Sequence, residues 1–299
     1  MIAEAAPRPG PLAVWWMGAR PRTLVAAVVP VMVGAGWAGR DGISIPRSLL
    51  ALIVALAFQV GVNYANDYFD GVRGVDTAAR MGPRRLVASG LAPPRAVATA
   101  AIAMVSVALI AGLVLSLLTT PWLIAAGAAS ALGLLLYSGG PKPYASSGLG
   151  EISVFVFFGL VATCGTAYVQ QDRIDASVLW LAVPVGLLAC ALLMANNLRD
   201  IPTDTLAGKR TLAVRLGASP SRRLLIATVV IALVLPALGA LFRDLPPLTA
   251  LTLVTAALAI APLRTVAVAE GRALVPALIG ITRLELVFGV VLAAALLAS

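Results

Sequence analysis

The chain has 299 residues, of which 60% are hydrophobic and 12% are charged, whereas soluble domains are roughly half apolar and a quarter charged. The mean hydropathy is +0.97, and long apolar runs predict a multi-spanning membrane protein. The net charge of +9 is spread between these runs, which argues against nucleic-acid binding. The chain contains no histidine, which excludes histidine bases and histidine–metal sites.

We expect an all-α membrane protein with nine membrane-spanning helices, arranged as two four-helix repeats plus a ninth helix. A single domain covers residues 1–299, and its first segment, about residues 1–21, is predicted to lie at the membrane interface because Trp15 and Trp16 precede the first apolar run. The predicted spans are residues 23–38, 48–64, 96–118, 122–137, 149–170, 178–196, 224–242, 248–268 and 273–298.

The basic residues predict the orientation of these spans. With a cytoplasmic N-terminus, the outer loops hold Arg40, Arg47, Arg173 and Arg243, and Arg283 lies in the last span. All the other Lys and Arg residues then lie in cytoplasmic segments, as the positive-inside rule requires. We therefore expect a plasma-membrane protein whose N-terminus and functional site are cytoplasmic and whose C-terminus is outside.

An acidic motif ends the second predicted span and opens a loop of about residues 66–95. Because residues four apart share one face of a helix, Asn66 and Asp70 are predicted to point the same way. Asp67, one position after Asn66, points about 100° away. The motif reads Asn63-Tyr-Ala-Asn66-Asp67-Tyr-Phe-Asp70, and Arg73 and Asp76 follow it.

The fourth predicted span ends in a short polar turn, Tyr137-Ser-Gly-Gly-Pro-Lys142-Pro-Tyr144. An interfacial tyrosine and a loop lysine are ordinary in membrane proteins, so the segment alone does not indicate a site. Beside the acidic motifs, we interpret Lys142 as a diphosphate ligand and Tyr137 as a residue near an acceptor.

A second acidic motif ends the sixth predicted span and opens a loop of about residues 197–223. Its Asn196, Asp200 and Asp204 are again four apart and share one helix face. Lys209 and Arg210 follow in the loop. Four spans separate the two motifs, so both are predicted to lie on the same side of the membrane.

Acidic and amide oxygens on two neighbouring helices predict a magnesium site that holds a diphosphate. Magnesium prefers oxygen ligands and often completes its shell with phosphate. A lone acidic loop motif is usually just solvated, but two copies that begin within apolar spans favour a function, because buried ionisable groups are costly. The predicted metal ligands are Asn66, Asp70, Asp76, Asn196, Asp200 and Asp204, and the predicted diphosphate ligands are Arg73, Arg85, Lys142, Lys209 and Arg210.

These motifs resemble those of the UbiA superfamily of intramembrane prenyltransferases, and most closely its 1,4-dihydroxy-2-naphthoate branch, which serves menaquinone synthesis. The matching stretches are residues 63–76, 85–90 and 196–217, although Gly74 stands where the wider superfamily has aspartate. The resemblance implies that magnesium holds a prenyl diphosphate, that an allylic cation forms in a cavity open to lipid, and that an aromatic ring attacks it with loss of carbon dioxide. We assign catalytic roles to Asp70, Asp200, Lys142 and Tyr137, and acceptor binding to Arg22, Asn63 and Tyr137.

Two alternatives to this function remain open from the sequence. Within the enzyme class, the alternative is a prenyltransferase for another acceptor, such as 4-hydroxybenzoate. A transporter also carries polar motifs on repeat-related helices. Transporters place ionisable residues near the bilayer midplane, however, whereas these acids lie at one face.

Overall fold

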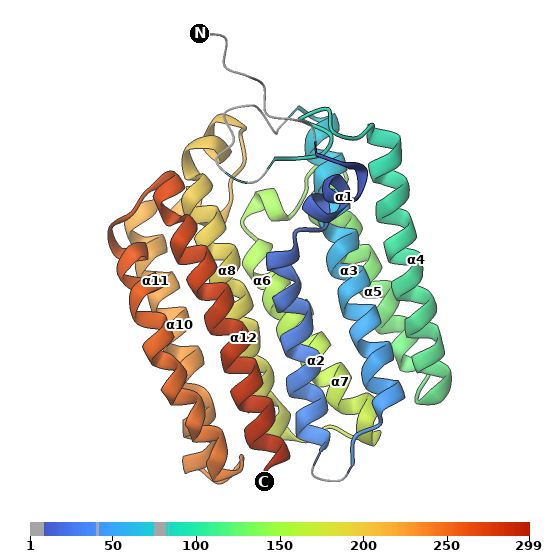
Figure 1. Ribbon diagram of the computed structural model, residues 1–299, viewed down its shortest axis with the longest axis vertical. Helices are drawn as coiled ribbons and strands as arrows, with labels where there is room; N and C mark the ends of the chain where they lie inside the picture. Colours follow the sequence, from blue (N-terminus) through green and yellow to red (C-terminus); the bar gives the residue numbers. More distant parts are fainter. Residues whose placement is uncertain (1–8, 40–41, 75–81, 83) are drawn as a thin grey trace.

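The computed structural model describes residues 9–39, 42–74, 82 and 84–299, and the secondary structure of these residues is helical throughout (Figure 1). The α-helices are α1 Pro11–Ala19, α2 Val25–Ala38, α3 Ile45–Val72, α4 Pro94–Leu118, α5 Trp122–Ser138, α6 Gly150–Val154, α7 Ala162–Gln171, α8 Leu179–Leu206, α9 Leu212–Leu216, α10 Ala218–Leu241, α11 Ala256–Val268 and α12 Val275–Leu297. Short 3₁₀ turns are η1 Pro21–Leu24, η2 Ala145–Ser147, η4 Ala176–Val178, η5 Pro247–Thr255 and η6 Gly271–Leu274, and η3 Phe155–Val161 is a π-helix.

Within the described residues, eight helical stretches are long and apolar enough to cross a membrane. The shorter apolar helix α5 has 17 residues, equivalent to about 26 Å. These nine stretches follow the order of the nine predicted spans. The expectation of an all-α, multi-pass membrane protein is confirmed, and the count of nine crossings stays a prediction.

The two acidic motifs lie in the last turns of long helices, as their spacing of four predicted, and these helices extend beyond the predicted span ends. Helix α3 continues to Val72 and α8 continues to Leu206. Each helix ends close to a glycine with positive φ, Gly74 at 67° and Gly208 at 72°. Glycine adopts this backbone conformation without strain and commonly ends a helix. The polar side chains of the motifs do not end the helices; the glycines that follow them do.

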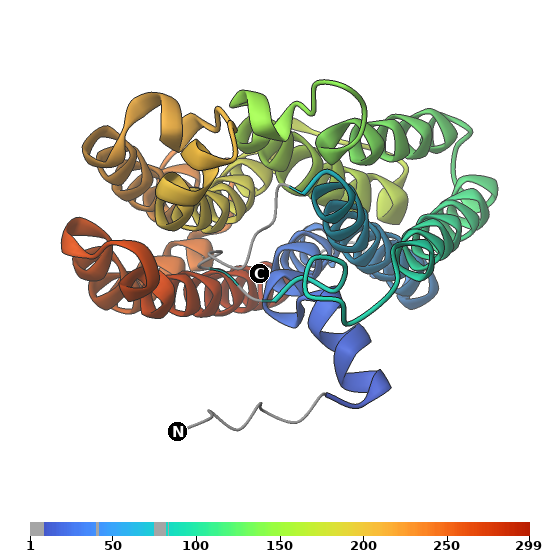
Figure 2. The same cartoon turned by 90° about the horizontal axis from the view of Figure 1, so that it is seen from above.

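Corresponding helices of the two predicted repeats pack together in the same way. Helix α3 packs along α4, and α8 packs along α10. Between these pairs, α2 contacts both α7 and α12, and the bundle closes around it (Figure 2). The largest buried apolar cluster includes Leu188, Leu225 and Phe288 and joins α2, α8, α10 and α12. This arrangement is consistent with the predicted repeat, which stays a prediction.

Helix α1 lies across one end of the bundle, whereas α12 ends at the opposite end (Figures 1 and 2). The Trp15 ring meets the Tyr64 ring edge-on with centroids 5.7 Å apart. The Tyr64 hydroxyl donates a 2.9 Å hydrogen bond to the Trp15 carbonyl. Trp16 is exposed on the outer side of α1. The outer side of α1 thus exposes the apolar side chains of Leu12 and Trp16. The interfacial placement of this segment stays a prediction.

Helices α6 and α7 are joined by the π-helix η3 into one continuous helix from Gly150 to Gln171. Such π segments inside helices are rare and frequent at functional sites. Gly159 in this segment packs directly on Gly186 of α8, because a Cβ atom added to Gly159 would lie 2.7 Å from the Gly186 Cα. This close contact fixes one wall of the cavity described next.

Candidate active site

A cavity of about 1590 Å³ lies inside the bundle and carries polar residues at one end. Its lining on α3 runs from Asp70 to Ala51, which corresponds to about 28 Å of helix. The lining far from Asp70 is apolar and includes Leu115, Trp122 and Val169. The cavity therefore suits a ligand with a charged head and a long apolar body.

The two acidic motifs meet at the polar end of this cavity. The Lys209 ammonium lies 3.1 Å from the Asp70 Oδ2, although the two residues are 139 positions apart. The Arg85 Nη2 lies 3.9 Å from the same carboxylate oxygen. All three side chains line the cavity. The structure thus brings together residues from both predicted loops.

Asp200 is held by its neighbour in the sequence. The Arg199 Nε and Nη2 donate hydrogen bonds of 2.7 and 2.6 Å to its two carboxylate oxygens. Arg199 is buried and lines the cavity with Asp200. The sequence analysis did not assign Arg199 to the site. A charged residue at the inner end of a span, next to an acid, was the available signal.

The amide side chains of the motifs are tied to nearby groups. Asn66 accepts a hydrogen bond from the Ser138 hydroxyl. Asn196 donates a 3.0 Å hydrogen bond to the backbone of its own helix at Leu192. Both amides line the cavity, as does Asp204. The side chains that the spacing of four placed on one helix face therefore line the same cavity.

Several predicted ligands lie elsewhere. Lys142 and Arg210 are exposed and are not among the described cavity-lining residues. Arg73 donates a 2.7 Å hydrogen bond to the Ser138 carbonyl and lies 5.6 Å above the Phe69 ring. Asp76 lies outside the described residues. The diphosphate roles of these basic residues, and metal binding by Asp76, stay predictions.

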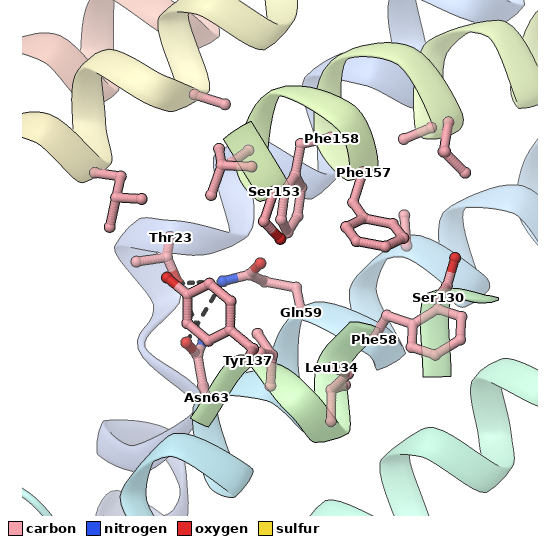
Figure 3. A pocket seen from close by; sticks show the side chains of 18 of the residues that line it. Thr23, Phe58, Gln59, Asn63, Ser130, Leu134, Tyr137, Ser153, Phe157 and Phe158 are labelled. Atoms are coloured by element: carbon pink, nitrogen blue, oxygen red, sulfur yellow. Dashed lines mark hydrogen bonds between the residues drawn. The ribbon is translucent and has the colours of Figure 1, made fainter. Parts of the chain in front are cut away.

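Buried amides connect α3 to the start of α2. The Asn63 Nδ2 donates to the Ala19 carbonyl at 2.8 Å and to the Thr23 hydroxyl at 3.1 Å. The Gln59 Nε2 also donates to the Thr23 hydroxyl, at 2.9 Å, and this network borders the cavity (Figure 3). Gln59 was missed from the sequence, although a glutamine within an apolar run, four residues before Asn63, was a usable signal. Arg22 is exposed and lines the cavity close by.

Aromatic side chains face each other across the cavity. Phe157 and Phe158 extend from the π-helix towards the space that Tyr137 and Gln59 approach from the opposite side (Figure 3). The Phe157 ring rests on α5, because a Cβ atom added to Gly133 would lie 2.5 Å from it. Both rings line the cavity.

The Tyr137 ring is supported by a neighbouring tyrosine in the turn after α5. The Tyr144 ring meets it edge-on with centroids 5.4 Å apart. Burial raises the pKa of the Tyr144 phenol. Its hydroxyl donates a 2.7 Å hydrogen bond to the Gly133 carbonyl. Tyr144 thus fixes the position of Tyr137 at the cavity wall.

The donor set is of the kind that magnesium prefers. Asp70, Asp200 and Asp204, with amide oxygens of Asn66 and Asn196, line the same cavity, and magnesium binds such oxygens. Among the described residues no three acidic or cysteine side chains already form a compact metal cluster. Lysine and arginine instead neutralise Asp70 and Asp200. The residues present fit a site that gathers around a metal–diphosphate ligand.

Residues 27–275 match the UbiA prenyltransferase family. The chain belongs to this family. It is similar to the 1,4-dihydroxy-2-naphthoate octaprenyltransferase of Mycobacterium tuberculosis, with 55% identity over 70% of this chain and 72% of that relative. The Haemophilus influenzae protein of the same name is 40% identical over 71% of each chain.

The fold matches that of solved UbiA structures. A UbiA homologue from Archaeoglobus fulgidus, bound to GPP and Mg²⁺, superposes with a TM-score of 0.69 and covers 96% of this chain and 100% of that one. Its sequence identity is 17%, so this likeness concerns the fold alone.

Proposed function

We propose that this UbiA-family protein transfers a polyprenyl group from a prenyl diphosphate to 1,4-dihydroxy-2-naphthoate and releases carbon dioxide. The product is a demethylmenaquinol, a precursor of menaquinone. The observation that carries the proposal is the contact between Asp70 and Lys209, which joins both acidic motifs at the polar end of a long apolar cavity. The names of the relatives at 55% and 40% identity support the choice of acceptor.

The diphosphate of the donor is proposed to bind at the polar end. Asn66, Asp70, Asn196, Asp200 and Asp204 would hold magnesium there, and Lys209, Arg85 and Arg199 would contact phosphate oxygens. The chemistry that bound magnesium supplies is positive charge beside a leaving diphosphate. The prenyl chain would occupy the apolar part of the cavity, which runs along α3 towards Ala51.

The reaction needs no strong base. The bond between prenyl C1 and oxygen breaks, and its electron pair leaves with diphosphate, whose charge Lys209 and Arg85 stabilise. The ring carbon that carries the carboxylate then bonds to C1. Loss of carbon dioxide returns an electron pair to the ring and restores its aromaticity. The absence of histidine from the chain is compatible with this chemistry.

Phe157 and Phe158 are proposed to shield the allylic cation from water. Their rings line the cavity opposite Gln59 and Tyr137 (Figure 3), and aromatic faces attract cations. Substituting Phe158 with Leu keeps an apolar wall but removes the ring. We expect the ratio of prenyl alcohol to prenylated acceptor to rise about threefold, and Phe158→Tyr to restore it. An unchanged ratio in Phe158→Leu would remove this role.

The acceptor is proposed to enter beside Asn63, Tyr137 and Arg22. Asn63 and Tyr137 line the cavity next to Phe158, and Arg22 lines it at an exposed position. A guanidinium group can grip the acceptor carboxylate with two hydrogen bonds. Arg22→Gln should therefore raise the KM for an acceptor that carries a carboxylate.

The acceptor and the reaction are tested together by following labelled carbon. Purified protein is given polyprenyl diphosphate, magnesium and 1,4-dihydroxy-2-naphthoate labelled at the carboxyl carbon. Labelled carbon dioxide equal in amount to the prenylated product supports the proposal. Label retained in the product, or turnover only with 4-hydroxybenzoate, contradicts the acceptor assignment. Substrate movement across proteoliposomes without any new product would indicate a transporter.

The polar end of the cavity is proposed to face the cytoplasm, following the distribution of Lys and Arg. A cysteine placed at Ala207, just after α8, tests this in a chain whose Cys164 and Cys190 are replaced by alanine. An impermeant thiol reagent should label it only from the cytoplasmic side. Labelling from the outer side of intact cells reverses the orientation.

A further inference from the structure

Asp67 lies inside the first acidic motif but faces away from the cavity. Its neighbours Asn66 and Asp70 line the cavity, whereas Asp67 is 1% exposed and does not. Its carboxylate accepts hydrogen bonds from two backbone amides, Leu86 N at 2.9 Å and Val87 N at 3.0 Å. Both oxygens of a buried carboxylate are thus used to hold a segment about twenty residues away.

The segment held by Asp67, residues 84–92, is called here the arginine loop. It is one compact turn, in which the amides of Ser89 and Leu91 donate to the carbonyls of Arg85 and Leu86 at 3.0 and 2.9 Å. The turn itself is not helical, and α4 begins at Pro94, directly after its last residues. The part of the turn around Arg85 is instead held by contacts with α3 and α1.

Packing fixes the arginine loop against α3 and α1 at close range. Leu86 is fully buried, and a Cβ atom added to Gly18 of α1 would lie 2.6 Å from its Cδ1. On α3, a Cβ atom added to Gly71 would lie 2.5 Å from Val87 Cγ1. The loop therefore lies directly on the helix backbone, one turn beyond Asp67.

Arg85 is placed by this docking. It immediately precedes Leu86, whose amide Asp67 binds, and its guanidinium reaches the cavity, where its Nη2 lies 3.9 Å from Asp70 Oδ2. Asp67 and Asp70 are three positions apart on α3. One acid therefore holds the backbone of the loop, while the other meets the side chain that the loop delivers.

We infer that Asp67 is a positioning residue, which fixes the arginine loop so that Arg85 stays at the polar end of the cavity to bind the donor diphosphate. This inference rests on the proposed function for its ligand. Asp67 therefore has a different role from the proposed metal ligands of the same motif. A carboxylate is required because two N–H groups converge on its two oxygens, whereas asparagine offers one oxygen and an NH₂ group that opposes the second N–H.

The inference is tested with Asp67→Asn and Leu86→Ala, which release the same loop by different means. Each should raise the KM for polyprenyl diphosphate about tenfold, as loss of a group that orients a ligand commonly does. The magnesium concentration for half-maximal rate should not change. If both variants act through the loop, the double variant should be no worse than about the poorer single variant.

A matched control is Asp175→Asn. The Asp175 carboxylate also accepts a backbone hydrogen bond, from Ser177 N at 2.9 Å, but it is exposed and is not a cavity-lining residue. Its KM should equal that of the unmodified protein. Arg85→Lys should raise the KM without exposing the loop, because it changes only the delivered side chain.

Loop docking is measured independently of activity by trypsin cleavage after Arg85, located by mass spectrometry without substrate. Cleavage should be faster in Asp67→Asn and Leu86→Ala than in the unmodified protein and the control. Unchanged cleavage in both variants overturns the inference, as does a raised magnesium requirement with unchanged KM in Asp67→Asn. If the unmodified protein prenylates no acceptor while cleavage still accelerates, the proposed function fails and the docking role stands.

Discussion

The C-terminal ends of α3 and α8 carry the same spacing of acids but neutralise them differently. On α3, Asp70 meets cations from distant parts of the chain, Lys209 and Arg85. On α8, Asp200 pairs with its own neighbour Arg199 through two short hydrogen bonds. Asp70 on α3 therefore joins separate segments of the chain, whereas the Asp200 pair on α8 forms within one helix.

This difference indicates how each end responds to substitution. A change on α3 disturbs two loops and the cavity at once, because Asp67 and Asp70 both reach outside their helix. A change on α8 first leaves Arg199 buried without its carboxylate. Function is expected to depend more on the α3 acid, and local stability more on the α8 pair.

The largest expected effect is that of Asp70→Asn. We expect the turnover rate to fall about a thousandfold, because the same carboxylate is the proposed magnesium ligand and contacts both Lys209 and Arg85. Added magnesium should not restore it, and the unfolding temperature in detergent should change little. Asp172→Asn is the control, since Asp172 is an exposed acid that faces Arg47 at 3.6 Å. A rate within tenfold of the unmodified protein would remove Asp70 from the site.

Asp200→Asn is expected to lower turnover about a hundredfold and to destabilise the α8 end as well. Removing the carboxylate leaves the buried Arg199 guanidinium with one weaker acceptor, a loss of roughly 1–3 kcal/mol. Thermal unfolding in detergent compares this variant with Asp70→Asn. A lower unfolding temperature for Asp70→Asn than for Asp200→Asn would reverse the contrast between the two ends.

Lys209→Gln sharpens the comparison because it removes the contact between Lys209 and Asp70 while both Asp70 and Asp200 are kept. We expect the KM for prenyl diphosphate to rise about tenfold, since one charged contact is lost. Lys209→Arg should recover part of the affinity. Steady-state kinetics at fixed magnesium measure both. Equal KM values for Lys209→Gln and the unmodified protein would show that the link is structural only.

The smallest effects are expected at Lys142 and Arg210, which the sequence placed among the diphosphate ligands. Both are exposed and outside the described cavity lining, so Lys142→Gln and Arg210→Gln should change the KM by less than about twofold. The same kinetic assay used for Lys209→Gln decides this. A tenfold rise in either variant would mean that these residues move into the site when substrate binds.

Much of the site was predictable because helix periodicity is strong. The spacing of four placed Asn66 with Asp70, and it turned Asp67 away, as the structure shows. The predicted spans stop at residues 64 and 196 because hydropathy falls where polar side chains begin, whereas the helices continue through the motifs to Val72 and Leu206.

The remaining features depend on tertiary contacts that no local pattern encodes. The π-helix at Phe155–Val161 lies within an apolar run, and its sequence carries no distinct period. Whether Asp200 pairs with Arg199 or with Lys209 depends on how α8 packs against its neighbours. Lys142 was assigned to the diphosphate by its closeness to the motifs in an assumed layout, whereas the turn that carries it directs it outward.

The contact between Asp70 and Lys209 also sets an order of events during biosynthesis. The two residues are 139 positions apart, and at 5–20 residues per second the ribosome needs roughly 7–28 seconds to reach the second after the first. During that interval Asp70 lacks its later partner, while Asp67 can already bind the arginine loop. The first half of the chain is therefore synthesised before Lys209 is available to pair with Asp70. Translation pauses or chaperones that act before residue 209 would meet a chain in which Arg85 is available to Asp70 but Lys209 is not.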